Sequence, residues 1–335
     1  MKIKKRDVIF SSATVLQGSV FTVNMLMRRA SYEAWWIYAV VLVISLLPIF
    51  IYGRTNIYEE TGFVIHWLYV IFFIAIAAYN IKLLGTFVGE YVLSETPRWI
   101  FTVLFTALCI YGAAGGVKKL SELALVFFVI AVFSWITNLF LLAGSMETEN
   151  LLPVLRSNAL NYAETALSGG VFLLCDGAVL MCFKKEKGTL SGFALGGVLL
   201  FAVCAGTAAT LGATSGIYTW PTYEALRVIK SGNVMTRFET SSVFSLIALM
   251  FFKVSIMLCG ASEGIRKIKS VPFRVIITGC VAGVAAAFIT VPASVLVDFL
   301  ADKGVYILLP FVVFPLFIRV FGGFKKYFPK KQKKC

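Results

Sequence analysis

Asp176 and Lys253 are the residues of this sequence whose types and positions could do chemistry. Asp176 lies within "ALSGGVFLLCDGAVLMCF" and Lys253 within "SLIALMFFKVSIMLCGASEGI". An unpaired charge in membrane hydrocarbon costs at least about 2.5–3.5 kcal/mol, so we expect both to face the protein interior and to pair. The pair is purely structural, or it holds the bundle in one state, or Lys253 takes the place of a coupling sodium ion.

Other residue types that carry catalysis are sparse. His66 is the single histidine, so a nucleophile–histidine–acid set could form only around it, and none is present in the sequence there. The seven cysteines lack the paired spacing of a disulfide framework or a zinc site. We therefore expect no enzyme activity, no metal and no cofactor.

The composition is that of a membrane protein. Hydrophobic residues make up 59% of the chain and charged residues 14%, whereas soluble domains carry about 25% charged residues. A helix needs roughly 20 apolar residues to cross a bilayer, so the chain has room for about ten crossings. We predict an all-α protein whose spans are residues 8–26, 34–52, 63–92, 98–116, 120–143, 166–183, 189–213, 241–262, 273–294 and 304–322.

The basic residues predict the orientation of these spans. With the N-terminus inside, twenty of the 31 Lys and Arg residues fall in cytoplasmic segments and eight fall in outer ones, as the positive-inside rule requires. Both termini, including the basic tail 323–335, are then cytoplasmic. We attribute the net charge of +14 to this topology and to attraction to anionic lipid, and expect no nucleic-acid binding.

Ten spans can form two inverted repeats of five, here about 8–143 and 166–322, as in LeuT-like transporters. The first and sixth spans would then be equivalent, and both are interrupted by small residues. The first contains Gly18, and the sixth contains Gly169-Gly170 and then Asp176-Gly177. Glycine costs about 1 kcal/mol in a helix interior, so these positions predict half-helices that meet a ligand; close helix packing is the alternative.

Two further segments carry polar groups. In the long third span, Tyr79 and Asn80 lie near the middle and are candidates for a cavity wall. Between the seventh and eighth spans, "PTYEALRVIKSG" begins with Pro221 and predicts an amphipathic helix on the outer membrane surface. This helix is a lid, an anchor, a docking surface or a plain connector. Its candidate residues are Pro221, Glu224 and Arg227, and the Arg-acid pair that follows it is Arg237 and Glu239.

The stretch "WPTYEALRVIKSGNVMTRFETSSVFSLIALMFFK" resembles the spore germination permease family, the B subunits of nutrient germinant receptors. "ASYEAWW", "LSETPRWI", "IYGAAGGV" and "NLLPVL" also resemble that family and occur in the same order, so the resemblance covers nearly the whole chain. The sequence departs from the family at Lys118 and Glu122, where the usual signs are exchanged, and at Asp176, where Glu is usual. Lys118 and Glu122 keep the spacing of an i,i+4 ion pair.

The resemblance implies the ten-span fold of the amino acid/polyamine/organocation permease superfamily and a place in the spore inner membrane. It also implies an amino acid or similar small nutrient as ligand, and two protein partners, a receptor A subunit and a C lipoprotein. The ligand positions that it implies are Gln17, Gly18, Ser19, Tyr79, Gly169, Gly170, Asp176 and Lys253. Three hypotheses remain: a germinant-receptor subunit, an amino-acid permease of the same fold, and a scaffold with a vestigial cavity.

Overall fold

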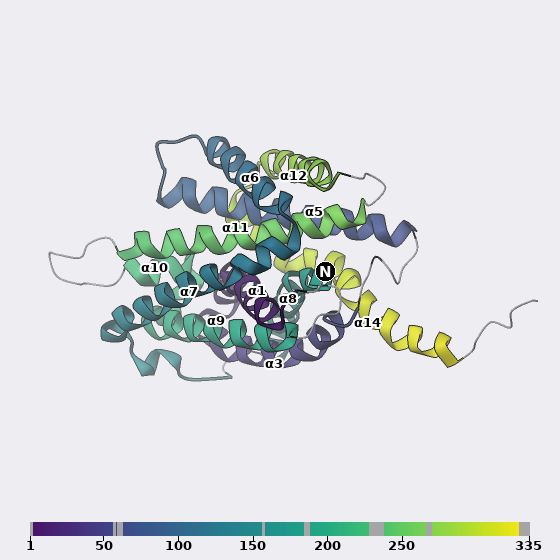
Figure 1. Ribbon diagram of the computed structural model, residues 1–335. Helices are drawn as coiled ribbons and strands as arrows, with labels where there is room; N and C mark the ends of the chain where they lie inside the picture. Colours follow the sequence, from purple (N-terminus) through teal and green to yellow (C-terminus); the bar gives the residue numbers. More distant parts are fainter. Residues whose placement is uncertain are drawn as a thin grey trace, which may run out of the picture.

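The computed structural model describes residues 3–55, 58, 63–155, 158–183, 188–227, 238–265 and 270–327, and the regular structure of these residues is helical (Figure 1). The first half contains α1 (Lys5–Gln17), α2 (Val20–Ala30), α3 (Ala34–Tyr52), α5 (Phe63–Tyr91), α6 (Arg98–Ala114) and α7 (Gly116–Leu142). The second half contains α8 (Ala159–Ala178), α9 (Thr189–Leu211), α10 (Pro221–Arg227), α11 (Phe238–Gly264), α12 (Val271–Phe288), α13 (Ala293–Phe299) and α14 (Val305–Tyr327).

The helices of the described residues match the ten predicted spans. Eight helical stretches are long and apolar enough to cross a membrane. One of them, Lys5–Tyr52, is 48 residues long and contains two crossings, since the chain turns at Ser31, where φ is +53°. The shorter apolar helix α6 supplies the remaining span.

The spans pack in two groups around a shared centre. α5, α6, α11 and α12 contact one another, while α3 and α9 form a second group with α1 and α8. α7 joins the two groups, because it packs against both α1 and α11. Figure 1 shows α6 and α12 at one edge of the bundle, α3 and α9 at the other, and α1 and α8 between them.

The interruption of the first span lies where the sequence predicts it, and that of the sixth span lies next to Asp176-Gly177, the second of the two places predicted there. α1 ends at Gln17 and α2 begins at Val20. α8 runs through Gly169 and Gly170 without a break and gives way to the 3₁₀ segment η4 (Val179–Phe183) only after Asp176-Gly177. A break at Gly169-Gly170 is therefore wrong. Gly169 serves close packing instead, because a Cβ there would lie 2.7 Å from a methyl carbon of Leu26.

The last two spans also differ from their predicted bounds. α12 ends at Phe288, and the last span begins with α13 at Ala293, well before the expected residue 304. A π-helical turn, η6 (Leu300–Gly304), joins α13 to α14. The polar residues Asp298, Asp302 and Lys303 interrupt the apolar pattern here, which is why the sequence suggested a later start.

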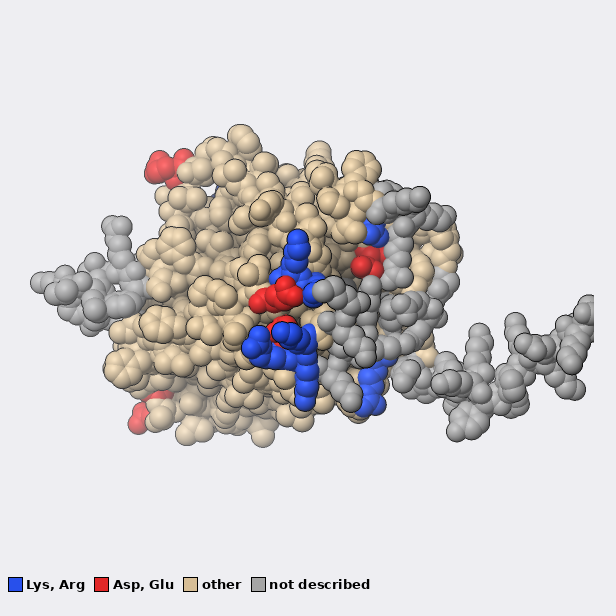
Figure 2. Space-filling model, viewed as in Figure 1, with Lys and Arg blue, Asp and Glu red and all other residues tan. Residues whose placement is uncertain are grey.

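The exterior of the bundle suits a lipid environment. Large apolar side chains project from several helices, among them Leu47, Leu104, Tyr111, Phe133, Phe140 and Phe288. An apolar exterior of this extent is foreign to a water-soluble monomer. In the view of Figure 2 the surface is mostly uncharged, and Lys and Arg gather in the centre and on the right.

Two tyrosines complete the hydrogen bonds of a proline-containing helix. Pro315, inside α14, has no N–H, so the carbonyl of Phe311 loses its helical donor. The hydroxyl of Tyr69 on α5 donates to this carbonyl at 2.7 Å. The hydroxyl of Tyr52 on α3 donates to the next carbonyl, that of Val312, at 2.5 Å. α3 and α5 thereby hold the proline-containing part of α14 against the bundle.

We expect Tyr69→Phe to lower the thermal stability of the purified protein, because the ring stays but the half-buried Phe311 carbonyl loses its donor, a loss of about 0.5–1.5 kcal/mol. Pro315→Ala restores a backbone N–H that donates to the Phe311 carbonyl, so Tyr69→Phe should lower the stability much less in that background. Melting temperatures in detergent check this, with the exposed Tyr111→Phe as control. Equal effects of Tyr69→Phe in both backgrounds would contradict the assignment.

Candidate ligand-binding site

The interruption of the first span is a site of close helix contact. Gly18 and Ser19 lie between α1 and α2. A Cβ on Gly18 would lie 3.0 Å from Cδ of Lys253 and 3.3 Å from the carbonyl oxygen of Leu249, both on α11. Glycine at this position therefore allows the Lys253 side chain to run alongside the open backbone of the first span.

Lys253 and Asp176 form the expected ion pair at this interruption. The Lys253 Nζ donates to Oδ2 of Asp176 at 2.7 Å, and lies 3.3 Å from the Gly18 carbonyl and 3.4 Å from Oγ of Ser19. Ser19 Oγ donates to the same Asp176 oxygen at 2.6 Å. The two side chains are only 2% and 8% exposed. The pair is therefore a buried, hydrogen-bonded network that joins the first, sixth and eighth spans.

Helix dipoles favour this placement of the two charges. The C-terminal end of a helix carries a partial negative charge and the N-terminal end a partial positive charge. The ammonium group contacts the Gly18 carbonyl at the end of α1, while the Asp176 carboxylate is bound by Ser19, the residue before α2. Each charge thus lies against the helix end of opposite sign.

A deep cavity adjoins the ion pair. Its volume is about 110 Å³, and its wall contains Asp176 and Lys253 together with residues of the first, third, sixth and last spans: Phe21, Thr22, Ala75, Ile76, Tyr79, Asn80, Phe172, Cys175, Leu300 and Leu308. We call it the inner cavity. The rings of Tyr79 and Phe172 lie 5.9 Å apart on its wall. The wall of the inner cavity is mostly apolar, and its polar members besides the ion pair are Thr22, Tyr79 and Asn80.

The structure brings together some of the predicted ligand positions and separates others. Tyr79, Asp176 and Lys253 line the inner cavity, as does Asn80. Gly18 and Ser19 lie behind this wall as partners of Lys253.

The three remaining predicted ligand positions do not line the inner cavity either. Gln17 is fully buried, and neither atom of its amide has a hydrogen-bond partner among the described residues. Gly169 packs against Leu26, and a Cβ on Gly170 would meet Val41 at 3.9 Å, so both glycines face neighbouring helices instead of the inner cavity.

Sequence reasoning missed most of the apolar wall. Phe21, Phe172, Leu300 and Leu308 look like any other lipid-facing or core residue in the sequence, and Cys175 was interpreted as inert. The available signal was position: Phe21 follows the predicted break by three residues, and Phe172 and Cys175 lie within one helical turn of Asp176. Residues close to a buried charge on a helix share its face when they are three or four positions away.

The described part of the predicted outer helix is helical, and residues 228–232 lie outside the described residues. α10 spans Pro221–Arg227, and its apolar residues Tyr223 and Leu226 are buried against the bundle. Glu224 and Arg227 form an i,i+3 ion pair at 3.2 Å. Of the other positions predicted with it, Arg237 lies outside the described residues, and the side chain of Glu239 does as well.

The segment that leads into α10 covers the bundle above the first span. Trp220 packs between Phe21 and Phe87, with ring centroids 5.0 and 5.6 Å away. The amide of Thr222 donates to Oδ1 of Asn24 on α2 at 3.1 Å. α10 therefore caps the same end of the bundle at which α2 ends.

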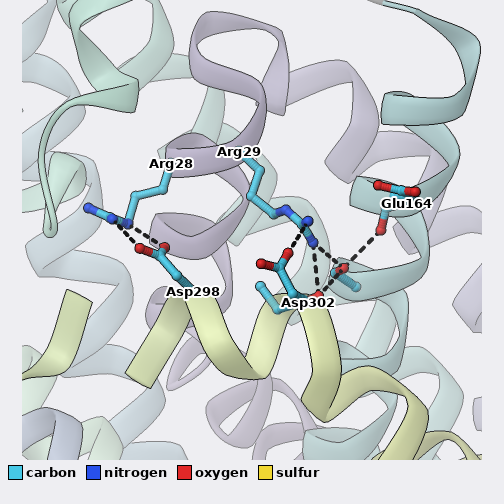
Figure 3. Close-up of polar contacts among 7 residues, drawn as sticks. Arg28, Arg29, Glu164, Asp298 and Asp302 are labelled. Atoms are coloured by element: carbon cyan, nitrogen blue, oxygen red, sulfur yellow. Dashed lines mark hydrogen bonds and ion pairs between the residues drawn. The ribbon is translucent and has the colours of Figure 1, made fainter. Parts of the chain in front are cut away.

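A set of ion pairs joins α2 to the last span at this end (Figure 3). Arg28 makes two hydrogen bonds to Asp298 on α13, at 3.1 and 2.8 Å. Arg29 binds Asp302 in the π turn and donates through Nη1 to the carbonyl of Ala301 at 2.9 Å and to Ser168 on α8 at 2.7 Å. The sequence places these charges on the same side of the membrane, but their pairing was not predicted.

Comparison with known proteins identifies the family. A family model described as "Spore germination protein" matches residues 8–295. The chain belongs to the spore germination protein family. Spore germination protein YndE of Bacillus subtilis (strain 168) is 25% identical over 228 residues, which is 65% of this chain and 62% of that relative. The match thus spans less than two thirds of the length of this curated relative.

Solved structures of transporters share the fold of this family member. Mhp1, a nucleobase-cation-symport-1 family transporter in a closed conformation with bromovinylhydantoin bound, aligns with a TM-score of 0.65 over 89% of this chain and 75% of that chain, at 10% identity. A Na⁺-coupled sialic acid symporter gives 0.59 over 88% and 76%, at 12% identity. The manganese transporter of Eremococcus coleocola gives 0.58 over 93% and 78%, at 15% identity. The expected LeuT-like architecture with interrupted first and sixth spans is confirmed.

We expect Lys253→Ala or Asp176→Ala alone to destabilise the protein by about 3–5 kcal/mol, because each leaves one buried charge without its partner. The double variant Lys253→Met/Asp176→Leu should recover much of this stability, since no unpaired charge remains. Thermal stability in detergent, followed by size-exclusion chromatography, measures the effect. Lys82 is half-buried, and Lys82→Met is the matched control for loss of a membrane lysine. Single variants as stable as the wild type would contradict the importance of the pair.

Proposed function

We propose that this protein is the ligand-binding membrane subunit of a spore germinant receptor, and that it binds an amino acid or a similar small nutrient in the inner cavity. The observation that carries the proposal is the position of the cavity beside a helix interruption with a buried Lys–Asp pair, in a member of the spore germination protein family. Ligand sites of transporters with this fold lie at such interruptions.

The walls of the inner cavity favour a small zwitterion with an apolar side chain. A volume of about 110 Å³ is well below the roughly 300–1,000 Å³ of sites for drug-sized ligands. Asp176 and Lys253 offer a carboxylate and an ammonium, while Phe21, Phe172 and Leu308 offer apolar contact. An α-amino acid presents both opposite charges at one end and its side chain at the other.

The ion pair supplies a reason for a two-state response. A ligand shifts a conformational equilibrium only through different affinities for the two states. An amino acid that binds Asp176 and Lys253 competes with their mutual hydrogen bond, which joins the sixth and eighth spans. Binding then favours a different spacing of these spans, and receptor partners detect that change.

Lys253 also removes the need for a coupling sodium ion. Its ammonium contacts three oxygens, the Gly18 carbonyl, Ser19 Oγ and Asp176 Oδ2, which is the kind of oxygen environment that binds a metal cation. The ammonium of Lys253 therefore already supplies the positive charge that a bound sodium ion would bring to this site.

We place both termini on the cytoplasmic side and the protein in the spore inner membrane, with the A subunit and the C lipoprotein as partners. The basis is the distribution of Lys and Arg in the sequence and membership of the family. α10 and its ion pair Glu224–Arg227 then lie on the outer side, as a lid or as a docking surface for a partner.

An amino-acid permease is the second candidate, and the similarity of the fold to transporter structures favours it. The cavity and the interrupted spans serve alternating access as well as they serve sensing. The two functions differ in outcome: a permease releases its ligand on the other side of the membrane, whereas a receptor retains it and signals to partners.

Parallel binding and uptake measurements with a panel of labelled amino acids, using the purified protein in liposomes, test the proposal. We expect saturable binding of a small apolar amino acid without accumulation, and loss of at least 90% of the binding in Lys253→Ala. Concentrative uptake that Lys253→Ala abolishes would establish the permease instead. Absence of binding for the whole panel, with the wild-type protein folded, would refute both.

Replacement of sodium by potassium or choline in the same binding assay is expected to change the dissociation constant by less than about twofold. The reason is that the Lys253 ammonium already occupies the cation environment. A dissociation constant that falls tenfold or more as sodium is added would show that a separate sodium site exists.

A further inference from the structure

The π turn Leu300–Gly304 separates the inner cavity from a second pocket. This pocket, here named the outer pocket, is open to the surface and has a volume of about 250 Å³, and Arg29, Glu164, Ser168, Ala301, Asp302 and Tyr306 are among its lining residues. The inner cavity is lined by Leu300, which directly precedes Ala301 and Asp302. At this position the two spaces are thus divided by a single turn of the last span.

Arg29 is the residue that fastens this turn. Its Nη1 donates to the Ala301 carbonyl at 2.9 Å, and its Nη2 binds the Asp302 carboxylate. The hydroxyl of Ser168 on α8 accepts a hydrogen bond from Arg29 and lies 2.8 Å from both the Ala301 carbonyl and the Glu164 carbonyl, to either of which it can donate its one hydrogen. The Ala301 carbonyl is therefore held by both the first and the sixth span (Figure 3).

A π turn is a suitable element for such a partition. Single π-helical turns occur frequently at functional sites, and here the Ala301 carbonyl of the turn accepts a hydrogen bond from Arg29. Here the first residue of the turn faces the inner cavity and the next two bind Arg29, so a displacement of Leu300 by a ligand acts directly on the Arg29 contacts.

We propose that Leu300 is a specificity-determining residue that limits the size of the ligand, and that Arg29 is the positioning residue that holds Leu300 in place through Ala301 and Asp302. Removal of the Leu300 side chain opens the partition and admits larger molecules. Removal of Arg29 frees the turn and has the same effect indirectly. The part of this inference that concerns the ligand rests on the proposed function, whereas the part that concerns the partition does not.

Cys175 provides a built-in probe of the partition. It is buried, with 2% exposure, and lines the inner cavity. In a variant that keeps Cys175 and replaces the other six cysteines by serine, a methanethiosulfonate reagent that enters the cavity forms a mixed disulfide with the Cys175 sulfur and releases methanesulfinate. The modification rate of the folded protein in detergent then reports how readily a molecule of given size passes the partition.

We expect slow modification of the parent variant by a methyl reagent and almost none by a benzyl reagent. Arg29→Gln should accelerate modification by at least tenfold. Arg28→Gln is the matched control, because it also removes an arginine that pairs with an aspartate of the last span but has no bond to the π turn. It should change the rate by less than about threefold. Ser168→Ala, which removes one donor to Ala301, should give an intermediate acceleration.

A double-substitution cycle separates this role from general loosening of the bundle. Leu308 lines the same cavity from the same span but lies outside the π turn. Arg29→Gln should accelerate modification by at least tenfold in the Leu308→Ala background and by less than about threefold in the Leu300→Ala background, where the partition is already open. Equal acceleration in both backgrounds, or none in either, would overturn the proposal. If Arg29→Gln does not fold, Ser168→Ala replaces it in the cycle.

The ligand panel gives the second readout. Leu300→Ala should shift the preference of the binding assay toward amino acids with larger side chains, by at least tenfold in relative affinity, while Leu308→Ala should shift it less. An unchanged preference would refute Leu300 as a specificity determinant. If the wild-type protein binds no amino acid, the proposed function fails, but the Cys175 rates still decide whether Leu300 and Arg29 form the partition.

Discussion

The contact between Lys253 and Asp176 constrains the rest of this structure. Two charges in the middle of a membrane protein are tolerated only if each has the other and enough further hydrogen bonds. Those further bonds come from Gly18 and Ser19, and they are available only because the first span stops being a helix there. The interrupted first span, the close approach of α11 and the position of the inner cavity therefore depend on one another.

The last span has a different part in the architecture. Side chains of α3 and α5 bind its carbonyl groups at Phe311 and Val312, and Arg29 and Ser168 bind its carbonyl group at Ala301. Leu300, directly before Ala301, and Leu308, between the two sets of bonds, contribute to the wall of the inner cavity. The last span is thus bound to spans of both repeats by side-chain hydrogen bonds. Such hydrogen bonds change partners when a helix moves, which suits a family whose fold is shared with transporters.

Much of the architecture follows from the sequence, because its signals are strong there. Long apolar runs define the spans, and the cost of isolated membrane charges predicts that Asp176 and Lys253 meet. Gly18 marks a real interruption, but Gly169 does not, because a small residue serves helix packing and helix breaking equally well in a sequence. The start of the last span was missed since Asp298 and Asp302 look like loop residues until their partners Arg28 and Arg29 are known.

The candidate site was predicted less completely than the fold. Its charged and aromatic members Asp176, Lys253 and Tyr79 were recognisable by type, whereas Phe21, Phe172 and Leu300 were not, because an apolar side chain looks the same in a sequence whether it faces lipid, core or cavity. Only the packing of four separate spans decides which apolar residues surround the same space.

The two tyrosine hydroxyls that bind the carbonyl groups of Phe311 and Val312 lie next to the proline at which the end of α14 can bend. The helix continues for twelve residues beyond Pro315, which corresponds to about 18 Å. A bend of about 20° at a proline would move its far end by roughly 6 Å. A bend of that size at Pro315 would therefore act first on these two side-chain hydrogen bonds, which have a net worth of about 1 kcal/mol each.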